Sequence, residues 1–152
     1  MVCNKVIIIA EAGVNHNGSL ENALKLVDVA AEAGADFVKF QTFKAEKLVS
    51  KEAKKADYAV QNTGNDDRQF DMLRSLELSL EDHYRIIKHC ECKNIKFLST
   101  AFDEEALEML VNMGVEMIKI PSGELTNLPY LIKAASYRMP IVVSTGMAVL
   151  EE

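Results

Sequence analysis

Short apolar runs alternate with helix-like segments along the 152 residues, and this alternation restricts the chain to few folds. Runs rich in β-branched or aromatic residues predict strands at 6–10, 37–41, 96–99, 117–120 and 141–144. Between them, the spacing of apolar residues predicts helices at about 20–33, 69–75, 79–93, 103–113 and 127–137. Strands that alternate with helices in this way predict right-handed crossovers and a parallel sheet.

Capping residues support these helix boundaries. Ser19 can cap the first helix and Gly34 can stop it, Ser79 with Asp82 resembles a capping box, and Asn127 precedes a proline. The polar connection 42–68 is unusually long and contains Asn and Gly residues that favour turns. Connections of this length are uncommon except as lids or binding loops, so this one is a functional hint.

Two lysines, Lys39 and Lys119, stand inside the apolar runs that predict strands. Strands of a parallel sheet are usually covered on both faces, so an ammonium group there must be dehydrated unless an anion meets it. An anionic ligand would explain both lysines. Two alternatives stay open: each lysine can pair with a buried structural carboxylate, or extend its charged end to solvent at the end of a strand.

Polar side chains also follow the apolar runs where each run stops. They are Glu11, Lys39 and Gln41, Ser99 and Thr100, Lys119 and Ser122, and Ser144 and Thr145. In a (β/α) barrel these positions converge on one mouth, whereas in an open doubly wound sheet they spread along an edge. Convergence favours the barrel, although each Ser or Thr alone could be a helix cap. The chain lacks the glycine-rich motifs of nucleotide-binding folds.

Composition excludes several classes of function. The net charge of -6 and the absence of a basic stripe argue against a nucleic-acid partner. No apolar run approaches the roughly 20 residues that span a bilayer, and no cleavable leader is visible, so we expect a cytoplasmic protein without a membrane partner. With 49% hydrophobic residues, the chain has enough for one core. Cys90 and Cys92 are expected to be reduced on a helix.

Five ordered segments of this sequence resemble the motifs of the sialic acid synthase family. They are Glu-Ala-Gly-Val-Asn-His-Asn-Gly at 11–18, Val-Lys-Phe-Gln-Thr at 38–42, Ser-Thr-Ala-Phe at 99–102, Lys-Ile-Pro-Ser-Gly-Glu at 119–124 and Ser-Thr-Gly-Met at 144–147. The resemblance implies condensation of phosphoenolpyruvate with an N-acetylated amino sugar, N-acetylmannosamine or a diacetamido analogue, to a nine-carbon acid plus phosphate. The connection 44–77 looks more like that of bacterial legionaminate-type members than that of vertebrate enzymes.

The same resemblance implies roles for individual residues. The residues that would bind phosphoenolpyruvate are Lys39, Thr100, Lys119, Ser122 and Ser144. Glu11 would be a catalytic carboxylate near the reacting carbons, Glu124 is a weaker catalytic candidate, and Gln41 and Asn65 would bind the sugar. Two ammonium groups and several hydroxyl donors form a sensible receptor for a compact trianion.

The histidines are interpreted differently. We expect His16 to stabilise a turn or to lie in the core, with a proton shuttle as the alternative, and His83 and His89 to lie on a surface helix without a catalytic role. The family uses a divalent metal, Mn²⁺ or Mg²⁺, that later strands bind through histidines. The three histidines here lack the spacing of a metal site, so we expect no metal ligand in this chain.

The resemblance also sets an expectation for the whole chain. Residues 1–152 would form the N-terminal portion of a (β/α)8 TIM-type barrel, about its first five βα units, without the later strands or the C-terminal antifreeze-like domain of the family. Such a portion is expected to be inactive alone and to belong to a longer gene product. The alternative is a non-catalytic half-barrel that binds a phosphorylated metabolite or assembles with itself. The family implies a homo-oligomer, a dimer.

Overall fold

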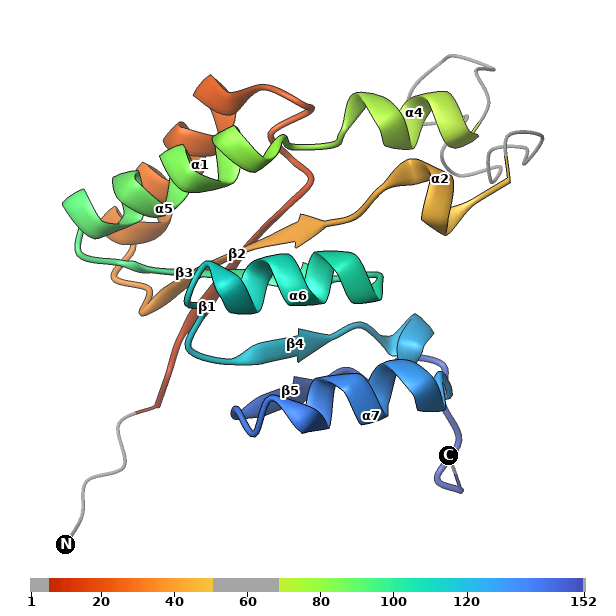
Figure 1. Ribbon diagram of the computed structural model, residues 1–152. Coiled ribbons are helices and arrows are strands. Elements are labelled where there is room, and N and C mark those ends of the chain that lie inside the picture. Colours follow the sequence, from red (N-terminus) through yellow and green to blue (C-terminus); the bar gives the residue numbers. More distant parts are fainter. Residues whose placement is uncertain (1–5, 51–68, 152) are drawn as a thin grey trace, which may run out of the picture.

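The computed structural model describes residues 6–50 and 69–151 (Figure 1). Its parallel sheet contains β1 (Ile9–Gly13), β2 (Phe37–Thr42), β3 (Lys96–Ala101), β4 (Ile118–Ile120) and β5 (Ile141–Val143). The helices are α1 (Leu20–Glu32), α2 (Ala45–Leu48), α4 (Gln69–Ser75), α5 (Leu80–Cys92), α6 (Glu104–Asn112) and α7 (Leu128–Ser136), with a 3₁₀ turn, η1 (Ser122–Glu124). No helix in this described part is long and apolar enough to cross a membrane.

The strands pair in the order of the sequence, β1-β2-β3-β4-β5, and every pair is parallel. In a doubly wound sheet, later strands are added on the other side of the first strand, so the spatial order differs from the sequence order, whereas a barrel adds each strand on the same side. The helices also follow one another across the fold, from α1 and α5 through α6 to α7 (Figure 1). The predicted parallel sheet is therefore confirmed, and its order is that of a barrel segment.

The core lies between the helices and one face of the sheet. Val38 and Phe40 of β2 are fully buried there against Val27 of α1 and Ile86 of α5. Because side chains alternate across a strand, Lys39 lies on the opposite face of β2. Burying each large apolar side chain stabilises the fold by about 1.5–3 kcal/mol. This burial fixes which face of each strand remains for polar groups.

The predicted caps are confirmed. Ser19 accepts a hydrogen bond from the backbone of the first turn of α1 at 3.3 Å, and Asp103 does so for α6 at 2.9 Å. Ser79 and Asp82 form a reciprocal capping box at the start of α5. Asn127 accepts from the backbone N–H of the third residue after it in α7. Each cap satisfies an N–H group that the helix cannot pair itself.

Two expectations about the first half of the chain are corrected. Strand β1 begins at Ile9 rather than at residue 6, because Ile9 pairs with Phe37, the first residue of β2, so residues 6–8 precede the ladder and are exposed. The shift places Glu11 inside β1 instead of after it. In addition, the connection after β2 includes helix α2, and Glu77 accepts a hydrogen bond from the backbone N–H of Ala45 at 2.8 Å.

Gly18 provides a test of this packing. Its φ of +73° is left-handed, and a Cβ atom there would lie 2.1 Å from the backbone oxygen of Ser75 at the end of α4. We expect Gly18→Ala to lower the free energy of unfolding by about 3 kcal/mol or more, because backbone strain and a steric clash add. Urea unfolding measures this change.

Gly34 is the matched control for that substitution. It has a similar φ of +78°, but a Cβ atom there meets nothing within 4 Å. Gly34→Ala should therefore cost only the backbone strain, about 1 kcal/mol. Equal losses in the two variants would contradict the close contact between the first loop and α4.

Candidate functional site

Lys39 and Glu11 form an ion pair across the first two strands. They are direct partners in the β1–β2 register, and the ammonium group of Lys39 contacts the carboxylate of Glu11. The Lys39 side chain is only 13% exposed, whereas that of Glu11 is 52% exposed. Lys39 also donates to the hydroxyl of Thr100 at 3.4 Å. Lys39 thus has a carboxylate partner, but Glu11 is half exposed and is not the buried structural carboxylate of the first alternative.

Lys119 has different hydrogen-bond partners from those of Lys39. Its ammonium group donates to the backbone oxygen of Ile120 and to the hydroxyl of Ser144, both at 2.6 Å, and no carboxylate among the described residues forms an ion pair with it. Burial lowers the pKa of Lys119, the charge of Lys39 lowers it further, and Glu11 partly opposes both effects. Thr100 is the register partner of Lys119 in β3 and β4. The two lysines therefore share one electropositive region.

A β-bulge next to Glu11 shapes the edge of this region. The register between β1 and β2 shifts between Glu11 and Gly13, and Gly13 has a φ of +55°. A Cβ atom on Gly13 would lie 3.2 Å from Oε1 of Glu11 and 3.7 Å from Nε2 of Gln41. Bulges often redirect side chains near functional sites. The Glu11 carboxylate and the Gln41 amide therefore both lie around Gly13.

The other predicted site residues differ in their placement. Ser122 lies near Gly146, with its hydroxyl 3.5 Å from where a Cβ atom of that glycine would be. Glu124 instead accepts a hydrogen bond from the amide of Asn127 at 2.6 Å and lines a separate cavity of about 460 Å³. The structure shows no contact between Glu124 and the two lysines. Asn65 lies outside the described residues.

Sequence reasoning missed a buried polar chain on the helix side of the sheet. His83, expected on a surface helix, is buried, because it shares the inward face of α5 with Ile86. Its ring contacts the hydroxyl of Thr42 at 2.9 Å and the backbone oxygen of Ser79 at 2.8 Å. Thr42 in turn contacts Ser99 at 2.7 Å. The helical spacing of His83 from Ile86 could have indicated this burial.

The hydrogen bonds that join Ser79, His83, Thr42 and Ser99 can be donated in only one consistent direction. A backbone oxygen only accepts, so Nδ1 of His83 carries its proton and Nε2 accepts from Thr42, which in turn accepts from Ser99. This corrects the expectation that Ser99 lies at the mouth with Thr100, since neighbours in a strand point to opposite faces. These hydrogen bonds join β2, β3 and α5 on the face of the sheet opposite Lys39 and Thr100.

The remaining histidines and the cysteines behave as expected. His16 is fully buried, and its Nδ1 accepts from the backbone N–H of Gly18 at 3.0 Å, which stabilises the turn. His89 pairs with Asp28 at 2.8 Å on the surface. Cys90 and Cys92 are free thiols on α5, and burial raises the pKa of Cys90 to about 12. A thiol with so high a pKa is not a nucleophile at neutral pH.

Comparison with known proteins identifies the family. The model of the NeuB family matches residues 26–152. The chain belongs to the NeuB family. It is 54% identical to the N,N'-diacetyllegionaminic acid synthase of Campylobacter jejuni, over 97% of this chain and 44% of that relative. The same synthase of Legionella pneumophila is 52% identical over 95% of this chain and 41% of that relative. The human N-acetylneuraminate-9-phosphate synthase is 34% identical, over 92% of this chain and 39% of that relative.

Solved structures agree with this assignment. The N-acetylneuraminic acid synthetase of Leptospira borgpetersenii superposes with a TM-score of 0.83 at 32% identity, over 97% of this chain and 47% of that chain. A truncated 3-deoxy-D-arabino-heptulosonate 7-phosphate synthase of Thermotoga maritima shares the fold at 16% identity, with a TM-score of 0.64. This NeuB family chain is therefore part of a TIM-type barrel. It spans less than half the length of the curated relatives it matches.

The described residues do not fit a metal ion. No three His, Cys, Asp or Glu side chains within 6–50 and 69–151 are grouped so that they could hold one. None of the described residues is therefore assigned as a metal ligand.

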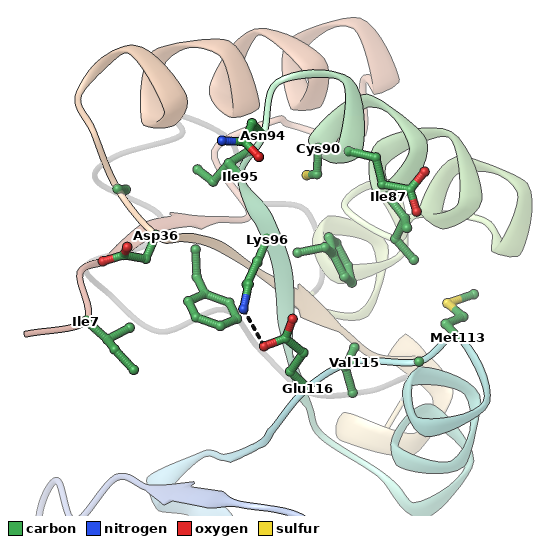
Figure 2. Close-up of a pocket in the computed structure, with 15 residues that line it drawn as sticks. Ile7, Asp36, Ile87, Cys90, Asn94, Ile95, Lys96, Met113, Val115 and Glu116 are labelled. Carbon is green, nitrogen blue, oxygen red and sulfur yellow. Dashed lines mark hydrogen bonds and ion pairs between the residues drawn. The ribbon is translucent and has the colours of Figure 1, made fainter. Parts of the chain in front are cut away.

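A second cavity lies at the other end of the strands. It has a volume of about 670 Å³ and is lined where β2 and β3 begin and where α5 and α6 end (Figure 2). Lys96 spans it, with an ion pair to Glu116 at 2.7 Å and its ammonium group 5.4 Å from the centre of the Phe37 ring. Active sites of TIM-type barrels lie at the carboxyl ends of the strands, so this cavity is not the candidate site.

The buried histidine predicts a pH dependence of stability. Burial lowers the pKa of His83 below its ordinary value of 6.5, so the unfolded chain takes up a proton first as the pH falls. The stabilisation that the neutral His83 ring contributes is therefore fully present above pH 6.5 and is lost as the pH falls below this value. His83→Gln should lower the free energy of unfolding at pH 7.5 by about 1–3 kcal/mol and make its decline toward pH 5 shallower.

Thr42→Val is the control for this prediction. It removes the hydroxyl group that donates to His83 but leaves the titrating ring in place. The variant should be less stable at neutral pH yet keep the steep decline in acid. His16, whose pKa burial also lowers, contributes a decline of the same sign in every variant. Denaturant unfolding at a series of pH values measures these slopes, and an unchanged slope in His83→Gln would contradict the assignment.

Proposed function

We propose that the residues around Lys39 and Lys119 form the phosphoenolpyruvate-binding part of a synthase. This synthase would condense phosphoenolpyruvate with an N-acetylated amino sugar. The observation that carries the proposal is the pair of strand-borne ammonium groups of Lys39 and Lys119, which lie beside the hydroxyls of Thr100 and Ser144. Their combined charge suits a small ligand with a phosphate and a carboxylate group. Ser122 follows the same strand as Lys119 and supplies a further hydroxyl.

The proposed reaction forms one carbon–carbon bond. C3 of phosphoenolpyruvate attacks the open-chain aldehyde of the sugar, water adds at C2, and phosphate leaves from the resulting intermediate to give a nine-carbon acid. Lys39 and Lys119 would hold the anionic groups and stabilise the charge on the departing phosphate. Glu11 would lie near C2, where its carboxylate can stabilise positive charge or accept a proton from the attacking water.

The choice of sugar follows from the relatives. The two N,N'-diacetyllegionaminic acid synthases are 54% and 52% identical to this chain, whereas the human N-acetylneuraminate-9-phosphate synthase is 34% identical. We therefore favour a diacetamido sugar over N-acetylmannosamine. Gln41 is the described residue proposed to bind it, with Asn65 as a further candidate, while Glu124 remains the weaker catalytic candidate.

Several further expectations remain proposals. A divalent metal, Mn²⁺ or Mg²⁺, is expected for the family, with ligands other than the described residues. We likewise propose that the complete gene product carries an antifreeze-like domain, forms a dimer and is cytoplasmic. Each can be examined on the gene product from its natural source.

Substitution of the lysines tests the anion site. Lys39→Met and Lys119→Met keep the length of the side chain but remove its charge, so each should weaken phosphoenolpyruvate binding by about 10- to 100-fold, the range for hydrogen bonds to charged groups. Isothermal calorimetry measures the affinity. Lys25→Met is the matched control, because Lys25 pairs with Glu21 on the surface of α1 at 2.6 Å. Unchanged affinity in both site variants would refute the proposal.

A measurement of phosphate release distinguishes a catalytic synthase from a non-catalytic half-barrel. The 152 residues alone are expected to bind phosphoenolpyruvate without releasing phosphate when a diacetamido sugar and Mn²⁺ are added, because the described residues supply no site that would polarise the aldehyde. A colorimetric phosphate assay measures the rate. Release above the rate of the Lys119→Met variant would show that the 152 residues suffice for catalysis. Binding without release, also in the complete gene product, would favour the non-catalytic half-barrel.

A further inference from the structure

The two lysines of the anion site are neutralised unequally by the protein's own groups. Lys39 contacts the carboxylate of Glu11, whereas the acceptors of Lys119 are the neutral oxygens of Ile120 and Ser144. An ammonium group as enclosed as that of Lys39 needs a counter-charge, because dehydrating an isolated charge is costly. Glu11 supplies that counter-charge from the neighbouring strand.

The partners of this ion pair differ in their freedom to move. Lys39 is 13% exposed and is fixed by the middle of β2 and by Thr100, while Glu11 is 52% exposed. Glu11 is the more exposed partner, so it is the one that can leave the contact toward solvent. Gly13 carries no side chain that would crowd the Glu11 carboxylate on the side of Gln41. The structure thus leaves room for Glu11 beside its present position.

Charge decides what happens when an anion arrives. The site holds two positive side chains and one negative side chain, so Glu11 cancels half of the charge that attracts a ligand. A phosphate or carboxylate group bound to Lys39 would lie against the Glu11 carboxylate, and like charges at contact distance repel each other. The two anions therefore compete for one ammonium group.

We propose that Glu11 is an internal counter-ion that occupies the substrate's place on Lys39 and is displaced toward Gln41 when phosphoenolpyruvate binds. This inference rests on the proposed function. Before binding, Glu11 reduces the repulsion between Lys39 and Lys119 and holds the site together. After binding, its carboxylate is released beside the residue that we propose for the sugar, so occupation of the first subsite prepares the second.

Removing the carboxylate tests the competition. Glu11→Gln in the complete protein should bind phosphoenolpyruvate about 2- to 5-fold more tightly by calorimetry, since a partly exposed ion pair of this kind contributes up to about 1 kcal/mol. Glu21→Gln is the matched control, because it removes a carboxylate from an ion pair with Lys25 on the surface of α1. Its affinity should equal that of the wild type.

Two further variants separate contact with Lys39 from general repulsion. In the Lys39→Met background, Glu11→Gln should give little or no gain, because the contested ammonium group is gone. Glu11→Asp keeps the charge but shortens the side chain by one methylene, so it should give part of the gain of Glu11→Gln. Equal gains with and without Lys39, or no gain from Glu11→Asp, would overturn displacement in favour of general repulsion.

The outcomes distinguish this inference from the proposed function. Wild-type binding with no gain in Glu11→Gln or Glu11→Asp rejects the internal counter-ion and leaves the anion site intact. No phosphoenolpyruvate binding by wild type, Glu11→Gln or Glu21→Gln rejects the anion site itself, and the counter-ion with it. If Glu11→Gln fails to fold by circular dichroism, Glu11→Asp decides the question alone.

Discussion

The need to neutralise two ammonium groups on the polar face of a parallel sheet governs the candidate site. Moving a charge out of water costs several kcal/mol even after the protein relaxes, so a strand lysine is retained only with partners. Lys39 has Glu11 and the Thr100 hydroxyl, and Lys119 has two neutral oxygens. The resulting excess of positive charge makes this face suited to an anion. The bulge at Gly13 lies beside this ion pair, and a Cβ atom on Gly13 would lie 3.2 Å from the Glu11 carboxylate.

The opposite face of the same strands is held by a different device. His83, Thr42 and Ser99 form a buried chain of hydrogen bonds between α5, β2 and β3. Each donor in the chain meets an acceptor, and a buried polar network is stabilising only when it is satisfied in this way. Gln41 and Thr100 are the sequence neighbours of Thr42 and Ser99 and point to the other face. These hydrogen bonds therefore hold the ends of β2 and β3 on the helix-covered face, while the opposite face carries the candidate site.

Geometry and family contribute different parts of the functional conclusion. The lysines, the hydroxyls and Glu11 specify the charge and size of a ligand, but many phosphorylated acids share those properties. Membership of the NeuB family, with two diacetyllegionaminic acid synthases above 50% identity, directs the proposal to a particular condensation. A shared fold alone would not do so, since one barrel supports many reactions. The structure adds what the relatives' names do not contain, the unequal neutralisation of the two lysines.

The sequence by itself determined the alternation of strands and helices, the caps at Ser19 and Ser79, and the two lysines that a strand does not need. These are local properties, because periodicity, capping and the cost of a charge depend on neighbours within a few residues. Only the tertiary structure decided that β1 begins at Ile9, that His83 is buried, and that Ser99 turns away from the mouth. It also decided that Glu11 is the partner of Lys39, which the open alternatives could not settle. Such pairings depend on the register between strands 28 residues apart, and a shift of one residue would move every side chain to the other face.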